Sequence, residues 1–338
     1  MAMTIYDISK KAGVSIATVS RVLNGSENVR PSTRKKVMDV IDKYDYTPNA
    51  FARGMGLHSL KTIGILCADS SDLFLAKAVY FLEQELQANG YESLLCCTGY
   101  NLDIKKNYLN LILSKKVDSI ILVGSNFIGS TEDENQYIKD VSTQVPIMLL
   151  SASFDYPNVY STLCDDYGTM FEATTEMIQA GITDILYLYD SKSYSGLKKL
   201  HGFRDAMKGH NIPGFEKLIH FYDGNIEHLD EIADFVAGIA KKGASFHGIM
   251  TSDDSLAIGS IKYAQKKGIR IPEDLSVMGY NNSMLTNCCT PELTSVDNRL
   301  ETQTHQLVQT LLGVLAGEEM PKKSIFSGKI IKRGTTLF

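Results

Sequence analysis

The chain has 338 residues, enough for two or three domains of ordinary size. Its 44% hydrophobic and 22% charged residues are ordinary for a soluble globular protein, and the formal net charge is −5. No apolar run approaches the ~18–20 residues that a membrane helix needs, so the sequence excludes a membrane-spanning protein.

The charge is divided unevenly along the chain. Residues 1–60 hold nine Lys/Arg against five Asp/Glu, whereas the remainder holds 25 against 34. A cationic head on an anionic body predicts polyanion binding by the head, although a chance basic face stays open on charge alone. The six cysteines form no CxxC motif and predict a reducing compartment. The N-terminus has no charged leader or apolar stretch, so we expect a cytoplasmic protein.

Three short helices are predicted in the first sixty residues. Thr4 to Asp7 reads as a capping-box start, and the first helix ends at Gly13. Ser15 can cap a second helix that runs to residue 23, with Val19 and Val22 facing inward. A third helix starts around residue 31 and stops before residue 47. Its inward side chains are expected to be Val37, Val40, Ile41 and Tyr44.

Beyond residue 61, short apolar runs alternate with amphipathic stretches. This alternation predicts parallel sheets covered by helices on both faces, in two similar lobes with a seam near residue 162. Ligands bind such sheets at the carboxyl ends of the strands, so the default pocket is a cleft between the lobes. The expected strands are 62–67, 93–97, 119–123, 146–150, 185–189, 248–251 and 275–279, and the expected helices are 76–88, 104–114, 197–207 and 256–267.

Residues 7–24 predict two helices about a Gly13-Val14 turn. Such a pair presents the start of its second helix outward, the arrangement that fits the major groove of DNA. Arg21 can donate two hydrogen bonds to guanine, while Ile16 and Ala17 offer apolar contact to a thymine methyl. The alternative is a helical hairpin packed in a core, which would bury costly polar side chains. These are Lys10, Lys11, Ser20 and Arg21, and they favour DNA reading.

The motif at residues 7–24 resembles the DNA-binding head of the lactose/galactose/purine repressor family. Residues 4–58 look like its head and hinge, and residues 61–338 resemble its effector core. Further matches are Arg53, Gly202-Phe203-Arg204, residues 271–277 before Gly279-Tyr280, and residues 291–296. The resemblance implies a symmetric homodimer, a palindromic double-stranded operator and a small-molecule effector.

The expected fold is a small all-α helix-turn-helix head plus an α/β core of two doubly wound parallel-sheet lobes, similar to periplasmic binding proteins. The head is expected at residues 1–46, the hinge helix or linker at 47–60, and the effector-binding and dimerisation core at 61–338. By the family pattern the first lobe covers about 61–162 and 292–326. The second lobe covers about 163–291 and 327–338, so the chain crosses between the lobes three times.

The hinge-like segment contains Arg53 and, at the place of the family's leucine wedge, Met55. Thr47 can cap it and Pro48 suits a first helical position. Because isolated helices need ~12–15 residues, we expect this segment to order only on DNA, with a plain linker as the alternative. The DNA-binding residues expected in head and hinge are Thr4, Tyr6, Ser15, Ile16, Ala17, Ser20, Arg21, Asn24, Asn49, Arg53 and Met55.

The pocket departs from the family pattern for sugars. Ser151, Leu197 and Asn281 stand where relatives often carry an acid, an arginine and an aspartate. We therefore expect a neutral effector, with a sugar or bulky glycoside as one candidate, and Lys198 or Lys199 as residues that can still reach inward. An anion is disfavoured. The expected effector-binding residues are Asp69, Phe74, Ser125, Ser151, Leu197, Tyr222, Asp253 and Asn281.

Two other functional classes fit the sequence less well. A secreted solute-binding protein would share the core but not the cationic head. An enzyme is disfavoured because the chain has no GxGxxG, GxxxxGK[ST] or GxSxG motif. The seven histidines show no metal-ligand spacing, so we expect no catalytic residue, cofactor or metal. An activator or global regulator that answers to a protein partner stays open as the runner-up.

Overall fold

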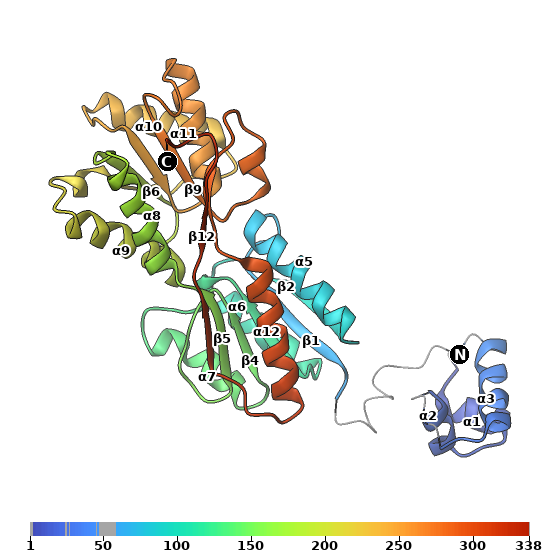
Figure 1. Ribbon diagram of the computed structural model, residues 1–338. Coiled ribbons are helices and arrows are strands. Elements are labelled where there is room, and N and C mark those ends of the chain that lie inside the picture. Colours follow the sequence, from blue (N-terminus) through green and yellow to red (C-terminus); the bar gives the residue numbers. More distant parts are fainter. Residues whose placement is uncertain (1–2, 24–25, 27, 45, 47–58, 338) are drawn as a thin grey trace. The chain divides into compact units, whose positions relative to one another are not determined.

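The computed structural model describes residues 3–23, 26, 28–44, 46 and 59–337. It divides into two compact units: Met1–Thr62 with Lys116–Asp118, and Ile63–Lys115 with Ser119–Phe338. We call the helical part of the first unit the head and the second unit the core (Figure 1). The hinge predicted for residues 47–60 lies outside the described residues, except for its last two.

The head consists of α1 (Ile5–Ala12), α2 (Ile16–Leu23) and α3 (Pro31–Lys43). The predicted capping box is present, because the Asp7 amide donates to Thr4 Oγ1 and the Thr4 amide donates to Asp7 Oδ2. Gly13 ends α1 at φ 66°, a left-handed conformation that glycine adopts without strain. The start and end of the first predicted helix are therefore confirmed.

Apolar side chains from all three helices form the core of the head. Ile8, Val19 and Val37 are fully buried, and Val22 is nearly so. Tyr44, expected to face inward, is 39% exposed, and the ammonium group of Lys11 lies 4.3 Å from the centre of its ring. Its position at the C-cap of α3 places it beyond the buried stripe of the helix.

The first lobe of the core is a six-stranded sheet in the order β11-β5-β4-β3-β1-β2. One face packs against α5 and α12 through Leu82, Leu86, Leu307 and Leu311. The strands are β1 (Thr62–Cys67), β2 (Glu92–Cys97), β3 (Ser119–Val123), β4 (Ile147–Leu150), β5 (Val159–Cys164) and β11 (Lys323–Phe326). The helices are α5 (Leu73–Ala88), α6 (Leu102–Ser114), α7 (Gln136–Ser142) and α12 (Leu300–Leu315), with short 3-10 turns at Ser125–Phe127 and Asp133–Asn135.

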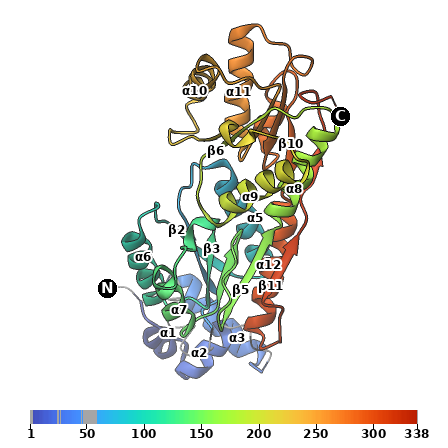
Figure 2. The same ribbon diagram turned by 90° about the vertical axis from the view of Figure 1, so that its left-hand side faces the viewer.

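The second lobe repeats this design in the order β12-β10-β9-β8-β6-β7. Alternate strand residues separate its two faces: Leu186 and Val277 pack towards α10 and α11, while Tyr187 and Met278 pack towards α8 and α9 (Figure 2). The strands are β6 (Ile185–Tyr189), β7 (Ile219–Phe221), β8 (Gly248–Thr251), β9 (Ser276–Tyr280), β10 (Thr294–Asp297) and β12 (Lys329–Ile331). The helices are α8 (Asp166–Gln179), α9 (Tyr194–Gly209), α10 (Leu229–Lys241) and α11 (Asp254–Lys267), with 3-10 turns at Phe215–Leu218 and Met284–Asn287.

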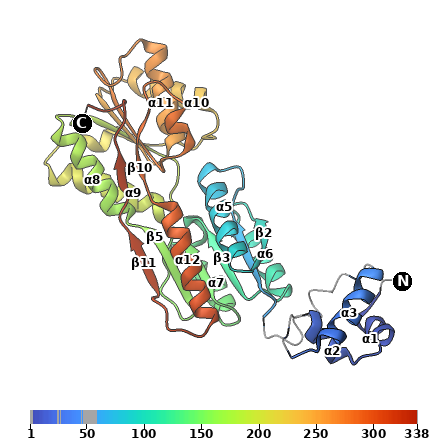
Figure 3. The same cartoon turned by 45° about the vertical axis from the view of Figure 1, so that its right-hand side comes forward.

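The chain passes between the two sheets three times, after β5, after β10 and between β11 and β12 (Figure 3). The middle passage was expected near residue 292, but β10 still pairs in parallel with β9 of the second sheet. The return to the first lobe therefore follows Asp297. The final strand β12 runs antiparallel to β10, an exception to the predicted parallel sheets.

Candidate functional site

The outer face of α2 carries the predicted DNA-reading side chains. Val19 and Val22 take the buried face, which leaves Ile16 39% exposed and Arg21 exposed. Ala17 is exposed beside them, and Ser20 is half-buried. At the start of α1, Thr4 is exposed and Tyr6 is 68% exposed. The four remaining expected residues, Asn24, Asn49, Arg53 and Met55, lie outside the described residues.

Ser15 caps the N-terminus of α2. Its hydroxyl accepts a hydrogen bond from the Thr18 amide at 3.2 Å and lies 2.9 Å from the Thr18 hydroxyl. This is the capping geometry predicted for the second helix, and it satisfies a backbone donor that would otherwise need water. The start of α2 is therefore stabilised by its own cap, which helps to fix the position of the side chains that follow.

A cleft lies between the two lobes of the core, at the carboxyl ends of the strands. It consists of two adjoining cavities. We call the cavity of about 150 Å³ the inner cavity and the cavity of about 640 Å³ the outer cavity. Five of the eight expected residues line the inner cavity, namely Phe74, Ser125, Ser151, Asp253 and Asn281. Asp69 lines the outer cavity.

Leu197 and Tyr222 line neither cavity. Leu197 is 36% exposed on α9, one position after Gly196, which does line the inner cavity. Because successive helical residues point about 100° apart, the inward place falls instead to Lys199. Tyr222 is buried in the core, and its ring packs edge-on at 5.2 Å from the ring of Phe235.

Two lining residues sit in left-handed backbone conformations. Ser151 directly follows β4 at φ 68°, and Asn281 directly follows β9 at φ 97°. Such conformations cost non-glycine residues about 1–3 kcal/mol and concentrate at ligand sites, where they aim a side chain. Both residues were expected in the pocket from the sequence, but their strain was not.

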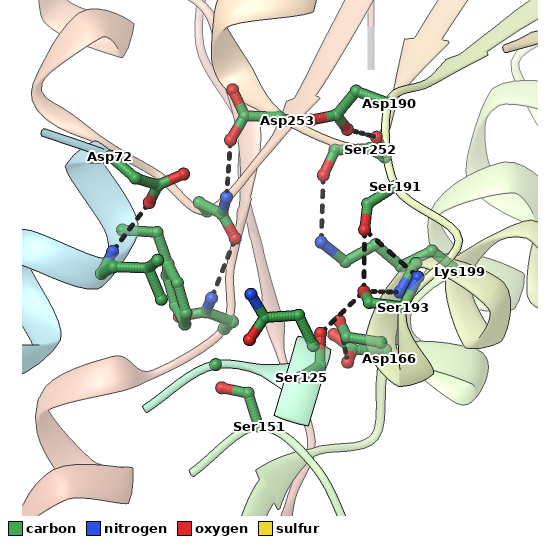
Figure 4. A pocket seen from close by; sticks show the side chains of 18 of the residues that line it. Asp72, Ser125, Ser151, Asp166, Asp190, Ser191, Ser193, Lys199, Ser252 and Asp253 are labelled. Atoms are coloured by element: carbon green, nitrogen blue, oxygen red, sulfur yellow. Dashed lines mark hydrogen bonds between the residues drawn. The ribbon is translucent and has the colours of Figure 1, made fainter. Parts of the chain in front are cut away.

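Sequence reasoning missed the main charged groups of the cleft. Asp72, Asp166 and Asp190 line the inner cavity with Lys199, which the sequence left as an option (Figure 4). Asp190 directly follows β6. The rule that ligands bind at strand carboxyl ends would have pointed to it.

Lys199 and Asp166 form the centre of a buried polar network. Lys199 Nζ donates to the Ser252 carbonyl at 3.0 Å and lies 3.9 Å from the centre of the Tyr280 ring. The two Asp166 oxygens accept from the Ser195 hydroxyl at 2.6 Å and the Tyr280 hydroxyl at 2.7 Å. Burial raises the pKa of Asp166, and the nearby charge of Lys199 opposes that rise.

The lobes also touch through hydroxyl groups. Ser125, at the carboxyl end of β3, donates to the hydroxyl of Ser193 at 2.8 Å, and Ser193 caps α9 in the second lobe. A neutral hydrogen bond contributes only about 0.5–1.5 kcal/mol. This contact therefore joins the lobes without locking them.

The core should lose stability as the pH rises from about 4 to about 7. Burial raises the pKa of Asp254 to about 7, with a further contribution from the charge of Asp253, so the folded state holds this proton more tightly than the unfolded state. The stabilisation is fully present below the unfolded pKa of about 4 and is lost as the pH passes the folded value. Urea unfolding at pH 5, 6, 7 and 8 measures the slope. Asp254→Asn should reduce the slope, to which Asp72 also contributes because its pKa is raised to about 6, and an unchanged slope would contradict the assignment.

Two further kinds of site are not found in the described part of the chain. None of its helices is long and apolar enough to cross a bilayer. Within the same residues, no group of three or more His, Cys, Asp or Glu side chains is placed to hold a metal ion.

Residues 4–49 match the family described as bacterial regulatory proteins, lacI family, and residues 174–336 match the periplasmic binding protein-like domain. An HTH-type transcriptional regulator from Lachnoclostridium phytofermentans is 50% identical over 336 residues, which are 99% of this chain and 100% of that protein. Catabolite control protein A from Priestia megaterium is 32% identical over 303 residues, or 88% of this chain and 87% of the relative.

Among solved structures, the lac repressor dimer bound to operator and the anti-inducer ONPF aligns with a TM-score of 0.88 at 20% identity, over 100% of both chains. This likeness shows a shared fold. The full-length identity to the regulator from Lachnoclostridium phytofermentans shows the family, whose members are DNA-binding transcriptional regulators and not enzymes. The chain belongs to the lacI family of bacterial regulatory proteins.

Proposed function

We propose that the chain is a ligand-responsive repressor that binds a palindromic operator as a dimer and holds a small effector in the cleft between its lobes. The head at residues 1–46 reads the operator, residues 47–60 act as the hinge, and the core carries the effector and the dimer contact. The effector that we propose is a sugar or a glycoside.

The observation that carries this proposal is the exposure of the outer face of α2. A capped helix that displays Ile16, Ala17 and Arg21 to solvent offers apolar groups and a guanidinium donor together, and these are the groups that can contact the edges of DNA bases. The wider head supplies the cationic surface that phosphates attract.

The cleft supports the effector part of the proposal. Phe74 and Tyr100 supply ring surface for stacking, and hydroxyl and amide groups surround them. Several carboxylates line the same space. An anionic effector would be repelled by them, whereas the hydroxyls of a sugar can donate to them.

Exposed apolar side chains at one edge of the first lobe support the dimer. They lie on α5, on the edge strand β2 and on α6, which stand together at this edge (Figures 1 and 3). An apolar surface of this kind usually marks a protein contact. The side chains are Tyr80, Leu94, Leu95, Ile104 and Leu111.

Sedimentation of the full chain at micromolar concentration should show a dimer. Leu95→Glu places a charge in the exposed face of β2 and should shift the protein towards monomer. The matched control is Ile325→Glu, which alters an exposed side chain on β11 at the opposite edge of the same sheet and should leave the dimer intact. A tetramer, or a dimer untouched by Leu95→Glu, would contradict this interface.

The function itself is tested by selecting bound fragments from the source genome. Footprints on the selected DNA should show two symmetric half-sites, and the adjacent genes would indicate the effector class. Anisotropy with labelled operator then shows which compounds change DNA affinity. Binding without preference among fragments would contradict the proposal.

A further inference from the structure

We propose that the effector is cationic: a small polyhydroxylated compound that carries one protonated amine, as amino sugars do. This inference rests on the proposed function and deepens it, because it changes the neutral ligand expected from the sequence into a positively charged one.

The first observation is the charge balance of the lining. Four carboxylates and the single ammonium group of Lys199 line the inner cavity within the described part of the chain. Lys199 is already engaged by the Ser252 carbonyl and the Tyr280 ring, and it lies beside Asp166. The carboxylates are Asp72, Asp166, Asp190 and Asp253.

The second observation is that these charges face one another across the cleft. Asp72 caps α5 in the first lobe, whereas Asp190 and Asp253 belong to the second lobe (Figure 4). Burial, together with the charges of Asp253 and Asp190, raises the pKa of Asp72 to about 6. Burial and then Asp253 also raise the pKa of Asp190. The protein thus holds like charges together that a bound cation would relieve.

The third observation concerns neutral acceptors. The side-chain oxygens of Asn298 and Gln303 are buried and have no hydrogen-bond partner among the described residues, and both side chains line the inner cavity. These residues are 4% and 1% exposed. A buried acceptor without a donor costs about 1–3 kcal/mol, so the cavity favours a ligand rich in donors.

An ammonium group offers three donors and no acceptor, and sugar hydroxyls supply further donors. A ligand carboxylate or phosphate would be repelled by the lining carboxylates, and it has no donor for the unpaired acceptors. The polar lining beside the carboxylates, including Ser125, Ser151 and Asn281, suits hydroxyls, which is why the amine is placed on a polyhydroxylated frame.

Such a ligand has a mechanical consequence for the core. An amine between Asp72 and the pair Asp190 and Asp253 attracts carboxylates of both lobes. Without a ligand, these carboxylates repel one another. Binding therefore favours the arrangement with the lobes together, and adds to the weak hydroxyl contact between Ser125 and Ser193.

The test is calorimetric titration of the full chain with matched sugars at pH 7. The probes are glucosamine, galactosamine and mannosamine, each beside its neutral parent, its N-acetyl derivative and its 6-phosphate. At least one amino sugar should bind roughly 10- to 100-fold more tightly than its parent and its acetylated form, the range expected for charged hydrogen bonds.

Two variants locate the amine. Asp72→Asn and Asp190→Asn should each remove most of that preference, because they weaken binding of the amino sugar far more than binding of its neutral parent. Asp103→Asn is the matched control, since Asp103 lies exposed in the first turn of α6 and outside both cavities. It should leave the preference intact.

The pH provides an independent readout. Amino-sugar binding should strengthen from pH 5 to pH 7 as Asp72 ionises, and by a larger factor than neutral-sugar binding. The titratable groups around Asp72 are Asp69, Cys67 and Tyr100 in its own lobe and Asp190 and Asp253 opposite, with Lys199 in the same lining.

Tighter binding of a neutral sugar or a sugar phosphate, equal binding of all members, or no binding of any amino sugar would overturn the cationic effector. Anisotropy with operator DNA separates this failure from that of the wider proposal. If specific DNA binding responds to a neutral sugar, the chain is a regulator but its effector is not cationic. If the chain shows no specific DNA binding, the proposed function itself is wrong.

Discussion

Arg21→Ala should weaken operator binding by about 1–3 kcal/mol, roughly 5- to 150-fold, and relax base preference at one symmetric position. Arg21 lies exposed on α2, on the face opposite the buried Val19 and Val22, so the variant removes a fork of donors without opening the core of the head. Anisotropy with operator and with random DNA measures both effects.

Lys36→Ala is the matched control for Arg21. It removes the same charge from the same head, but from the exposed surface of α3. A loss there should be equal on operator and random DNA, since a phosphate contact carries no sequence information. If Arg21→Ala also weakened both DNAs equally, Arg21 would be a phosphate contact.

Two glycine substitutions in α9 should change stability in opposite directions. A Cβ at Gly202 would lie 2.3 Å from the Tyr167 carbonyl oxygen in α8, so Gly202→Ala must push the two helices apart. We expect a loss of about 1–3 kcal/mol. Gly209→Ala meets nothing within 4 Å and should raise stability by about 0.5–1 kcal/mol, because alanine loses less backbone entropy on folding.

Urea midpoints of the full chain measure this pair. The same contact positions the cleft, since α9 carries Lys199 and α8 carries Asp166. Gly202→Ala should therefore weaken effector binding as well, whereas Gly209→Ala should not. Shifts of the same sign in both variants would show that helix propensity, and not the close approach of α8 and α9, controls the response.

The strands were predictable from the sequence where their buried residues are apolar. Runs such as 119–123 and 185–189 are buried on both faces and read as continuous hydrophobic strands. β10 was missed because two of its buried residues, Thr294 and Ser295, are polar. Their polar groups are satisfied by hydrogen bonds to Thr335, Thr336 and Asp254. The middle crossover near residue 292 was inferred from the family pattern, and the pairing of β10 with β9 moves it to after Asp297.

The site was predictable at strand ends and less so on helices. Ser151, Asp253 and Asn281 directly follow strands or cap a helix, so their place in sequence fixes their place in the cleft. On α9 the rotation of the helix decides which residue faces inward. Sequence alone could not choose between Leu197 and Lys199 before the helix start at Tyr194 was known.

The pairing of β5 with β11 sets an order of events during protein synthesis. Ser161 to Cys164 pair with Lys323 to Phe326, and the second lobe except for β12 is translated in between. Until then the ribosome-bound first lobe lacks both its edge strand and α12, whose Leu307 and Leu311 cover one face of its sheet. An unpaired strand edge and an uncovered apolar face favour aggregation, so the incomplete first lobe is more prone to aggregate than the lobe completed by α12 and β11.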